Sequence, residues 1–313
     1  MLYTGLQDLK GNIFMGKIKK LLVIAGSAKT GSTSLAKWLG QRDDMVLGTE
    51  KEGRYFTNFQ SDSWTGPASD GFRDTLITDA ASYEMNFPDL TDDQWAIDGS
   101  TDYIWADGTI GKLMEYAQTC EVKIICIARE PVSRAVSEYN HTLRHGWENM
   151  SFSHSLHAEQ DRRSAGWHPL FYHKRRSEIR DDIHRFHDAF GENLLVLDYQ
   201  DMKTADVVLE KVAKFLGVPD KPVDSSQAHN VSLLEKNKLS GRLKRSKFLL
   251  SLGRILLPGA IKRWLWNALH VEAKHKTTVS EKEKQAYSAL MAEEIAACKS
   301  SPLVPTDRWP SSE

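Results

Sequence analysis

Three short apolar runs in the chain have the length and composition of buried strands. They span residues 20–25, 122–128 and 193–197, and they are rich in Val, Ile and Leu. Continuous apolar runs of this length are typical of parallel strands that are covered on both faces. We therefore predict a strand at each of these three places.

Between and after these runs, apolar residues recur every three or four positions, which predicts helices. The predicted helices span residues 32–39, 109–117, 132–144, 177–190 and 204–216. Gly217 stops the last of them, with Pro219 just beyond. Strands that alternate with helices predict an α/β fold: a mostly parallel sheet, flanked by helices, that binds ligands at the carboxyl ends of its strands.

The chain shows no internal repeat and no low-complexity linker, so we expect one domain over residues 1–313. Its α/β core would occupy about residues 18–220. After Pro222 the pattern turns all-helical and basic. We expect residues from about 230 to 313 to form a helical extension that packs on the core.

Composition narrows the class of protein. Apolar residues make up 41% of the chain and charged residues 27%, which is ordinary for a soluble globular protein, and the net charge of -1 argues against a nucleic-acid partner. The cysteines Cys120, Cys126 and Cys298 have no metal-binding spacing and suit a reducing compartment. No apolar run has the length of a signal peptide core or a membrane span, so we expect a cytoplasmic protein.

The stretch GSAKTGSTS, which begins at Gly26, follows the first apolar run. It nearly matches the phosphate-binding P-loop, G-x-x-x-x-G-K-[ST], because Gly26, Gly31 and Thr33 are in frame. Ser32 occupies the lysine position, however, and a lysine appears three residues earlier, at Lys29. This change disfavours transfer of a γ-phosphoryl group, whereas the glycines and the helix start still predict a bound phosphate. The alternative is a glycine-rich turn without a ligand.

A second stretch, CIAREPVSRAVSEY, adds a candidate phosphate ligand. Arg129 follows the second apolar run, Pro131 begins a helix, and Ser137 lies two turns into it. The predicted fold places Arg129 at the carboxyl edge of the sheet, where a guanidinium can bind a phosphate through two hydrogen bonds. The alternative is that Arg129 pairs with a carboxylate such as Glu130.

Together the two stretches resemble the sulfotransferase family, enzymes that use 3′-phosphoadenosine 5′-phosphosulfate (PAPS). The family's 5′-phosphosulfate loop reads P-K-[TS]-G-[TS]-[TS]-x-L, and residues 28–35 match it at every position except the proline. Its 3′-phosphate motif reads R-[DE]-P-V-x-R-A-x-S-x-Y, and residues 129–139 match it throughout. The resemblance covers most of the chain, up to the closing TDRW. Within the family, the chain is most similar to bacterial members and to the carbohydrate-modifying branch.

The resemblance implies a set of residues that bind PAPS and its product, adenosine 3′,5′-bisphosphate, without a metal ion. They are Ala28, Lys29, Thr30, Gly31, Ser32, Thr33, Ser34, Arg129 and Ser137. Lys29 would also be catalytic, because it would sit at the bridging oxygen and neutralise the charge that appears there as the bond breaks. An acceptor hydroxyl on a glycan, a glycolipid or a small alcohol would receive the sulfuryl group.

The acceptor must lose a proton as it attacks, so a general base is needed within hydrogen-bond reach. The stretch Lys51-Glu52-Gly53-Arg54-Tyr55-Phe56 resembles the K-E-x-x-[FY]-F motif of the carbohydrate branch, which implies that Glu52 is the base. Burial beside a sulfonate would raise its pKa. Two alternatives stay open: Glu52 is a solvated loop carboxylate that pairs with Lys51 or Arg54, or a histidine is the base, as in the small-molecule branch. His141, His145 and His154 follow the second motif.

One departure concerns the acceptor side. The carbohydrate branch usually carries E-K-[ST]-P-x-Y before its 3′-phosphate strand, and the matching stretch here is DGSTDY, with Gly99 at the lysine position. Either Lys51 or Arg54 supplies the missing charge, or the acceptor has different electrostatics. Tryptophans in segments that should border the cleft suit a sugar or an apolar acceptor, but they could equally be packing residues. They are Trp64, Trp105, Trp147 and Trp167.

The segment 238–270 carries eight basic residues and no acidic one, interleaved with apolar stripes. We favour a helical flap that closes over the nucleotide; the other interpretation is peripheral contact with an anionic membrane. Two rival functions also stay open. One is an ATP-dependent kinase with a degenerate P-loop, in which Asp198 would hold magnesium, and the other is a non-catalytic binding protein. No pattern predicts the oligomeric state.

Overall fold

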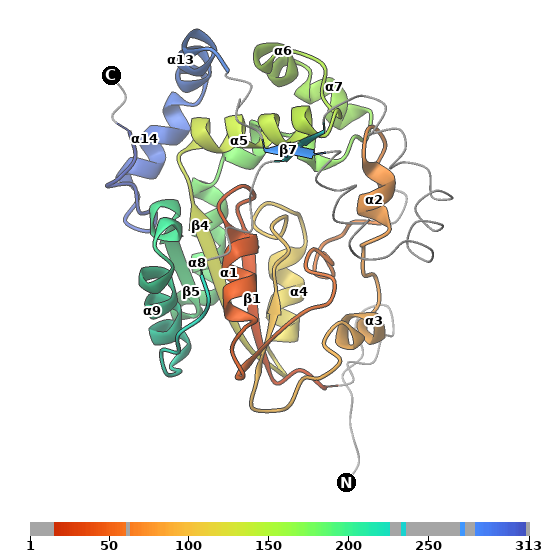
Figure 1. Ribbon diagram of the computed structural model, residues 1–313, viewed down its shortest axis with the longest axis vertical. Helices are drawn as coiled ribbons and strands as arrows, with labels where there is room; N and C mark the ends of the chain where they lie inside the picture. Colours follow the sequence, from red (N-terminus) through yellow and green to blue (C-terminus); the bar gives the residue numbers. More distant parts are fainter. Residues whose placement is uncertain (1–15, 61–62, 226–232, 236–269, 273–278, 311–313) are drawn as a thin grey trace.

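The computed structural model describes residues 16–60, 63–225, 233–235, 270–272 and 279–310. Its centre is a five-stranded parallel sheet in the order β2-β3-β1-β4-β5 (Figure 1). The strands are β1 Lys20–Gly26, β2 Met45–Leu47, β3 Trp95–Asp98, β4 Glu121–Ala128 and β5 Leu194–Asp198. The predicted α/β class and its parallel sheet are confirmed.

Strands β1, β4 and β5 correspond to the three apolar runs, but β2 and β3 were missed. β2 has three residues and β3 has four, which is too short for a pattern to be distinguished from a loop. β3 pairs with β1, with Leu21 opposite Ala96, and β2 pairs with the other side of β3. Pairing within the sheet, rather than local sequence, therefore makes these two segments strands.

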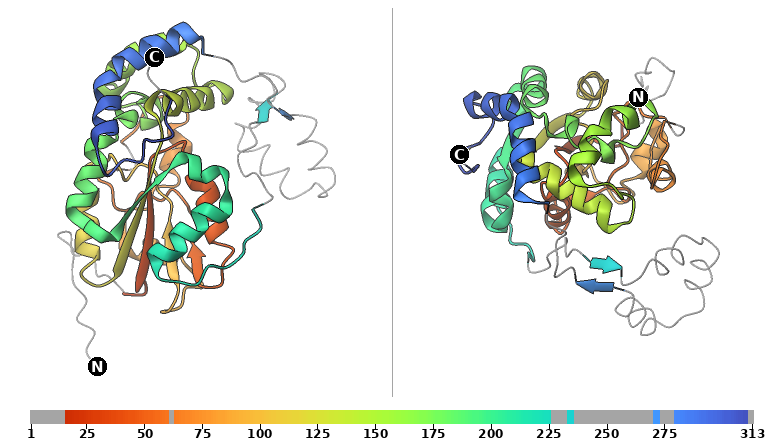
Figure 2. Two further views of the ribbon diagram at one scale, coloured as in Figure 1. Left: turned by 90° about the vertical axis from the view of Figure 1, so that its left-hand side faces the viewer. Right: turned by 90° about the horizontal axis from the view of Figure 1, so that it is seen from above.

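Helices cover both faces of the sheet, as predicted (Figure 2). Alternate residues of β1 point to opposite faces: Leu21 and Val23 pack with the side of α4 and α8, whereas Leu22 and Ile24 pack with the side of α1 and α9. The bounds of these helices are α1 Ser32–Leu39, α4 Thr109–Tyr116, α8 Arg180–Phe190 and α9 Ala205–Leu216. Gly217 ends α9 in the left-handed conformation, with φ 67°, as its position in the sequence predicts.

Helix α5, Pro131–Arg144, lies across the carboxyl ends of the strands (Figure 1). Its first turn begins with Pro131, and the carboxylate of Glu130 accepts hydrogen bonds from the N–H groups of Val132 (2.8 Å) and Ser133 (2.7 Å). Glu130 is therefore the N-cap of α5. Its carboxylate is occupied by the helix start rather than by Arg129.

Shorter helices build the loops around this edge and the outside of the molecule. They are α2 Ser69–Arg73, α3 Ala80–Met85, α6 Phe152–His157, α7 Glu159–Ser164 and the 3-10 turns Pro169–Phe171, Arg175–Ser177, Gly191–Asn193 and Tyr199–Lys203.

The C-terminal part departs from the all-helical expectation in one place. β6, Leu233–Glu235, and β7, His270–Glu272, form an antiparallel pair (Figure 2). Helices α13, Glu281–Leu290, and α14, Ala292–Ser300, then pack on α5 and α6 through a separate apolar cluster that includes Tyr139, Phe152 and Tyr287. The basic segment 238–270 lies outside the described residues, apart from His270.

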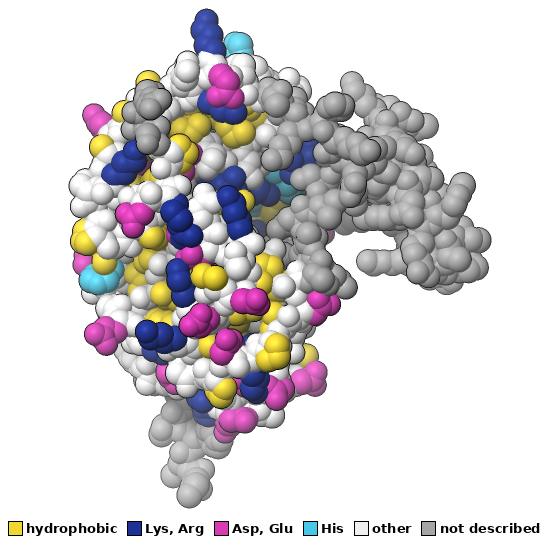
Figure 3. All heavy atoms as spheres, turned by 60° about the vertical axis from the view of Figure 1, so that its left-hand side comes forward, with side chains coloured by type: hydrophobic (Ala, Val, Ile, Leu, Met, Phe, Trp, Pro, Cys, Tyr) yellow, Lys and Arg dark blue, Asp and Glu magenta, His cyan; other side chains and the backbone are white. Residues whose placement is uncertain are grey.

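The face shown in Figure 3 carries interspersed acidic and basic side chains with small apolar areas between them. This distribution agrees with the net charge of -1. Among the described residues, no helix is long and apolar enough to cross a membrane.

Candidate active site

The residues predicted for the site come together at the carboxyl edge of the sheet. Lys29 follows β1, Arg129 follows β4 and Glu52 follows β2, while the DGSTDY stretch begins at Asp98, the last residue of β3. Because all five strands are parallel, these four strand ends lie at one edge. Helix α5 crosses this edge and supplies Ser137.

The loop between β1 and α1 has the form of an anion-binding turn. Gly31 has φ 88° and forms the N-cap of α1 without a side-chain hydrogen bond, while its carbonyl accepts from Ser34 N (2.9 Å) and Leu35 N (3.1 Å). No acceptor among the described residues takes the N–H groups of Ser32 and Thr33. These N–H groups, at the positive end of the helix dipole, are suited to phosphate oxygens.

The side chains of this loop divide into two groups. Thr30 is fully buried, and its hydroxyl donates to Ser27 O (2.5 Å). This side chain therefore closes the loop, and only the backbone of Thr30 is left to contact a ligand. Ala28 and Ser32 are also buried. The side chains of Lys29, Thr33 and Ser34 stay partly exposed.

Lys29 and Arg129 are joined directly. Lys29 has a left-handed backbone with φ 66°, and Arg129 Nη1 donates to the Lys29 carbonyl. Arg129 Nε donates to Ser133 Oγ (3.3 Å), and its guanidinium lies 4.1 Å from the centre of the Tyr199 ring. A left-handed lysine costs roughly 1 kcal/mol, so the hydrogen bond from Arg129 helps to hold the loop in this shape.

Ser137 lies one helical turn after Ser133 on α5, and Ser133 contacts Arg129. Residues four apart on a helix share a face, so Ser137 lies on the same face of α5 as Ser133, the residue that contacts Arg129. No other contact of Ser137 constrains its hydroxyl within the described residues. The pair Arg129 and Ser137 is thus arranged as the second motif predicts, although its role as a phosphate site stays a prediction.

The surroundings of Lys29 are unusually cationic. Burial is the main reason that the pKa of Lys29 is lowered to about 8; Glu138 opposes this shift, and Arg144, Arg176 and Arg129 add to it. A cluster of cations around a half-buried ammonium disfavours its charge, and a bound anion would restore it. The carboxyl edge of the sheet is therefore suited to binding a polyanion.

Glu52 is partly exposed, and it pairs with both Lys51 and Arg54, the two partners that the loop-carboxylate alternative gives it. Its Oε1 accepts from Lys51 Nζ (2.7 Å), its Oε2 accepts from Thr101 N (3.0 Å), and Arg54 Nη2 lies 3.8 Å from Oε2. Burial raises the pKa of Glu52, but Lys51 and Arg54 outweigh that effect, so its pKa lies below the ordinary value. Two neighbouring cations therefore dominate in the protein without donor, and the rise in pKa expected beside a sulfonate stays a prediction.

A buried chain of ion pairs links the neighbourhood of Glu52 to α5, and sequence reasoning missed it. Arg54 Nε pairs with Asp102 (2.8 Å), Asp102 pairs with Arg176 (2.8 Å), and Arg176 pairs with Glu138 of α5 (2.6 Å). Burial raises the pKa of Asp102, but Arg176 and Arg54 outweigh it and hold the pKa well below its usual range. Only a folded structure brings these four residues together, since they are spread over 120 positions in sequence.

The candidate histidine bases lie on or after α5. His141 and His145 have ring centres 4.4 Å apart, and His145 stacks on Trp147 at 4.5 Å. Burial, with a smaller contribution from Lys29, lowers the pKa of His141 to about 3, so His141 is neutral near pH 7. His154 lies on α6, where Ser151 Oγ is 2.7 Å from its Nδ1. None of the described hydrogen bonds joins these histidines to Glu52 or Lys29.

Of the four tryptophans expected near the acceptor, one is buried and three are partly exposed. Trp64 is 3% exposed, and its ring meets Phe59 at 5.0 Å, so it is a packing residue. Trp105 and Trp147 are partly exposed, and Trp105 Nε1 donates to Asp102 (3.2 Å). Trp167 packs beside Phe171 at 5.0 Å.

Asp198, the aspartate that a kinase would use for magnesium, is already engaged. Its carboxylate accepts from Gln200 N (2.9 Å) and pairs with Arg308 Nε (2.8 Å). Within the described residues, no group of three or more His, Cys, Asp or Glu side chains is arranged to hold a metal ion.

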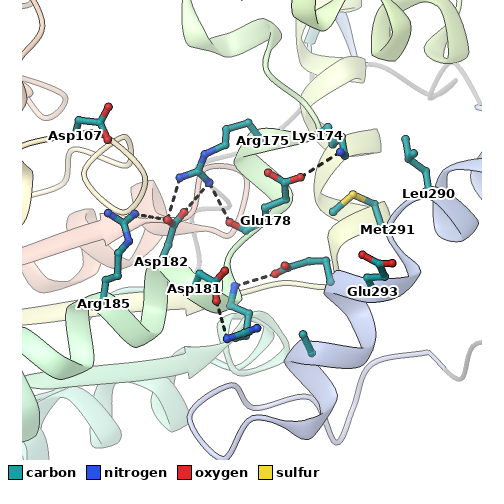
Figure 4. Close-up of a pocket in the computed structure, with 13 residues that line it drawn as sticks. Asp107, Lys174, Arg175, Glu178, Asp181, Asp182, Arg185, Leu290, Met291 and Glu293 are labelled. Carbon is teal, nitrogen blue, oxygen red and sulfur yellow. Dashed lines mark hydrogen bonds and ion pairs between the residues drawn. The ribbon is translucent and has the colours of Figure 1, made fainter.

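A pocket of about 590 Å³ lies between the start of α8 and α14, away from the residues of the candidate site (Figure 4). Its basic side chains pair with its own carboxylates: Lys174 with Glu178, Arg180 with Asp181, and Arg175 and Arg185 with Asp182. Glu294 of α14 accepts from the N–H groups of Ile179 and Arg180, both at 2.8 Å. Because each of its basic side chains already has a carboxylate partner, this pocket joins α14 to α8 rather than offering a site for an anion.

Comparison with known proteins agrees with this geometry. A family model described as a sulfotransferase domain matches residues 109–277, just over half of the chain. The crystal structure of a sulfotransferase from Alicyclobacillus acidocaldarius superposes with a TM-score of 0.62 at 27% identity, covering 74% of this chain and 92% of that one. No curated protein matches significantly. The chain therefore belongs to the sulfotransferase family, whose members are transferases.

Proposed function

We propose that the protein transfers the sulfuryl group of PAPS to an acceptor hydroxyl, with Glu52 as general base and no metal ion. The observation that carries this proposal is the junction of the phosphate loop with Arg129: one cationic edge offers free N–H groups, Lys29 and a guanidinium. Two phosphate groups, one on each side of a nucleoside, suit this donor set. PAPS supplies the sulfuryl group and a phosphate that can leave.

Each residue has a distinct part in the proposed reaction. Ser32, Thr33 and Ser34 hold the 5′ phosphate through the loop and the helix start, while Arg129 and Ser137 hold the 3′ phosphate. Glu52 accepts the proton of the acceptor hydroxyl as its oxygen bonds to sulfur. Lys29 neutralises the charge on the departing phosphate oxygen, the part that a metal ion plays in many phosphoryl transfers. The products are a sulfate ester and adenosine 3′,5′-bisphosphate.

The acceptor is proposed to be a glycan, a glycolipid or another alcohol. Partly exposed aromatic rings near the edge, including Trp105, Trp147 and His145, offer flat surfaces that suit a sugar ring. We place the activity in the cytoplasm, because Cys120, Cys126 and Cys298 are all buried and free, which suits a reducing compartment.

Thermal unfolding in the presence of EDTA tests the donor class without knowledge of the acceptor. Adenosine 3′,5′-bisphosphate at about 100 times its Kd should stabilise the protein by roughly 2.7 kcal/mol. The Arg129→Ala variant should show a much smaller effect, whereas the surface variant Arg185→Ala should behave like the original protein. Stabilisation by ATP that requires magnesium, with none from the bisphosphate, would favour a kinase instead.

A further inference from the structure

The side chain of Lys51 folds back over the end of β3. Its Nζ donates to the carbonyl of Gly99 (2.7 Å) and to Oε1 of Glu52 (2.7 Å). The side chain is 17% exposed, so most of its stem is covered. The ammonium is therefore fixed between the carbonyl of Gly99, just after β3, and the carboxylate of Glu52.

Gly99 provides the space in which Lys51 lies. A Cβ atom at this position would be 3.0 Å from both Cγ and Cε of Lys51 and 3.2 Å from Nζ. Gly99 is not among the residues with positive φ, so its backbone does not require glycine. The missing side chain, rather than the backbone shape, is what this position contributes.

Glu52 is held on its other side by the backbone. Oε2 accepts from Thr101 N (3.0 Å), two residues after Gly99. Arg54 Nη2 lies farther from the carboxylate of Glu52, at 3.8 Å from Oε2. The other donors of Arg54 are committed elsewhere, because Nη1 donates to the backbone carbonyl of Glu52 (2.6 Å) and Nε pairs with Asp102 (2.8 Å). Of the two cations that the sequence offered to replace the missing lysine, only Lys51 is seated at Gly99.

We infer that Lys51 is a positioning residue for Glu52, and that Gly99 is small so that Lys51 can reach this place. Lys51 fixes Oε1 while Thr101 N fixes Oε2, so the carboxylate presents one orientation to the acceptor hydroxyl. The charged groups that face Glu52 are Lys51, Arg54, Asp102 and, beyond them, Arg176. This inference rests on the proposed role of Glu52 as base.

Three variants test the pair. Lys51→Met removes the ammonium and keeps the stem, and Gly99→Ala displaces the flexible Lys51 side chain while leaving the backbone unstrained. The exchange variant Lys51→Met with Gly99→Lys returns an ammonium from the other side of the contact. Gly111→Ala is the matched control, because a Cβ there meets nothing within 4 Å.

The first readout is the pKa of Glu52 in the protein without donor, measured by NMR of ¹³C-labelled glutamate as the pH is varied. The signal of Glu52 is assigned as the one that disappears in Glu52→Gln. Lys51→Met and Gly99→Ala should both raise the pKa of Glu52, because a neighbouring cation is lost or moved. Gly111→Ala should leave it unchanged, and the exchange variant should lower it again. An unchanged pKa in both Lys51→Met and Gly99→Ala would overturn the inference.

The second readout separates positioning from donor binding. Both single variants should lower kcat by about 10- to 100-fold, the usual effect of a small misplacement of a catalytic group. Their affinity for adenosine 3′,5′-bisphosphate should stay within about threefold, and the exchange variant should recover part of kcat. Normal kcat in Lys51→Met would overturn the inference. If the unmodified protein does not bind the bisphosphate, the proposed function fails, while the NMR titration still decides the role of Lys51.

Discussion

The pKa of Lys29 makes the affinity for the donor depend on pH in a way that can be calculated. Burial lowers this pKa to about 8 in the protein alone. Phosphate charge beside the ammonium should raise the pKa in the complex, since an opposite charge favours the ionised form. Well below pH 8 the ammonium of Lys29 is already charged, and the affinity for the donor is at its maximum. Above pH 8 binding must first take up a proton, so affinity falls as pH rises toward the pKa of the complex.

The magnitude follows from the fraction of Lys29 that is protonated. Between pH 7 and pH 9.5 the Kd for adenosine 3′,5′-bisphosphate should rise by about 30-fold, equivalent to about 2 kcal/mol, if the pKa in the complex exceeds 9.5. At pH 8 binding should take up about half a proton per site. The phosphates titrate mainly near pH 6, outside this window.

Isothermal titration calorimetry in buffers of different ionisation enthalpy measures both the Kd and the proton uptake. Lys29→Met should bind more weakly at pH 7 and should lose both the proton uptake and the fall in affinity. Lys37→Met, on the exposed side of α1, is the matched control and should retain them. If Lys29→Met shows the same pH dependence as the original protein, another group titrates and Lys29 does not face the phosphates.

Three further predictions concern other parts of the site. Glu52→Gln should lower kcat by roughly 10²–10⁴-fold while the Kd for the bisphosphate changes by less than about threefold; a loss confined to Kd would remove Glu52 from the role of base. Arg176→Met should lower the free energy of unfolding by about 3–5 kcal/mol, because it removes the buried cation that Asp102 and Glu138 share and leaves each carboxylate with one cation fewer. Arg185→Ala, at the partly exposed end of its ion pair, should cost less than about 1 kcal/mol in the same denaturant titration. Arg129→Lys should weaken binding of the bisphosphate more than that of an analogue without the 3′ phosphate, yet both should weaken, since Arg129 also holds the carbonyl of Lys29; equal affinities for the original protein and the variant would refute this.

The sequence predicted the parts of the fold that local pattern encodes. β1, β4 and β5 are long apolar runs, and α9 ends at a glycine that local rules identify. β2 and β3 are defined by pairing within the sheet, and β6 and β7 by pairing across about 35 residues, so no local pattern reveals them.

The candidate site shows the same division. Lys29, Glu52 and Arg129 stand in motifs that can be read along the chain, and the parallel sheet explains why all three follow strands at the same edge. Asp102 and Arg176 carry no such signal, because each is a common surface residue type until the fold buries it beside an opposite charge. The contact of Lys51 with Gly99 depends on a vacant Cβ position, which only coordinates reveal.

Transfer of labelled sulfate is the most direct test of the proposed reaction. The protein would be incubated, in the presence of EDTA, with ³⁵S-labelled PAPS and cell extracts fractionated into glycans, lipids and small alcohols. The account predicts label in an acceptor fraction as a sulfate ester, with stoichiometric release of adenosine 3′,5′-bisphosphate, and loss of the label in Lys29→Met and Glu52→Gln. A protein that binds the bisphosphate tightly but labels no fraction, or a Glu52→Gln variant that labels as fast as the original, would contradict it.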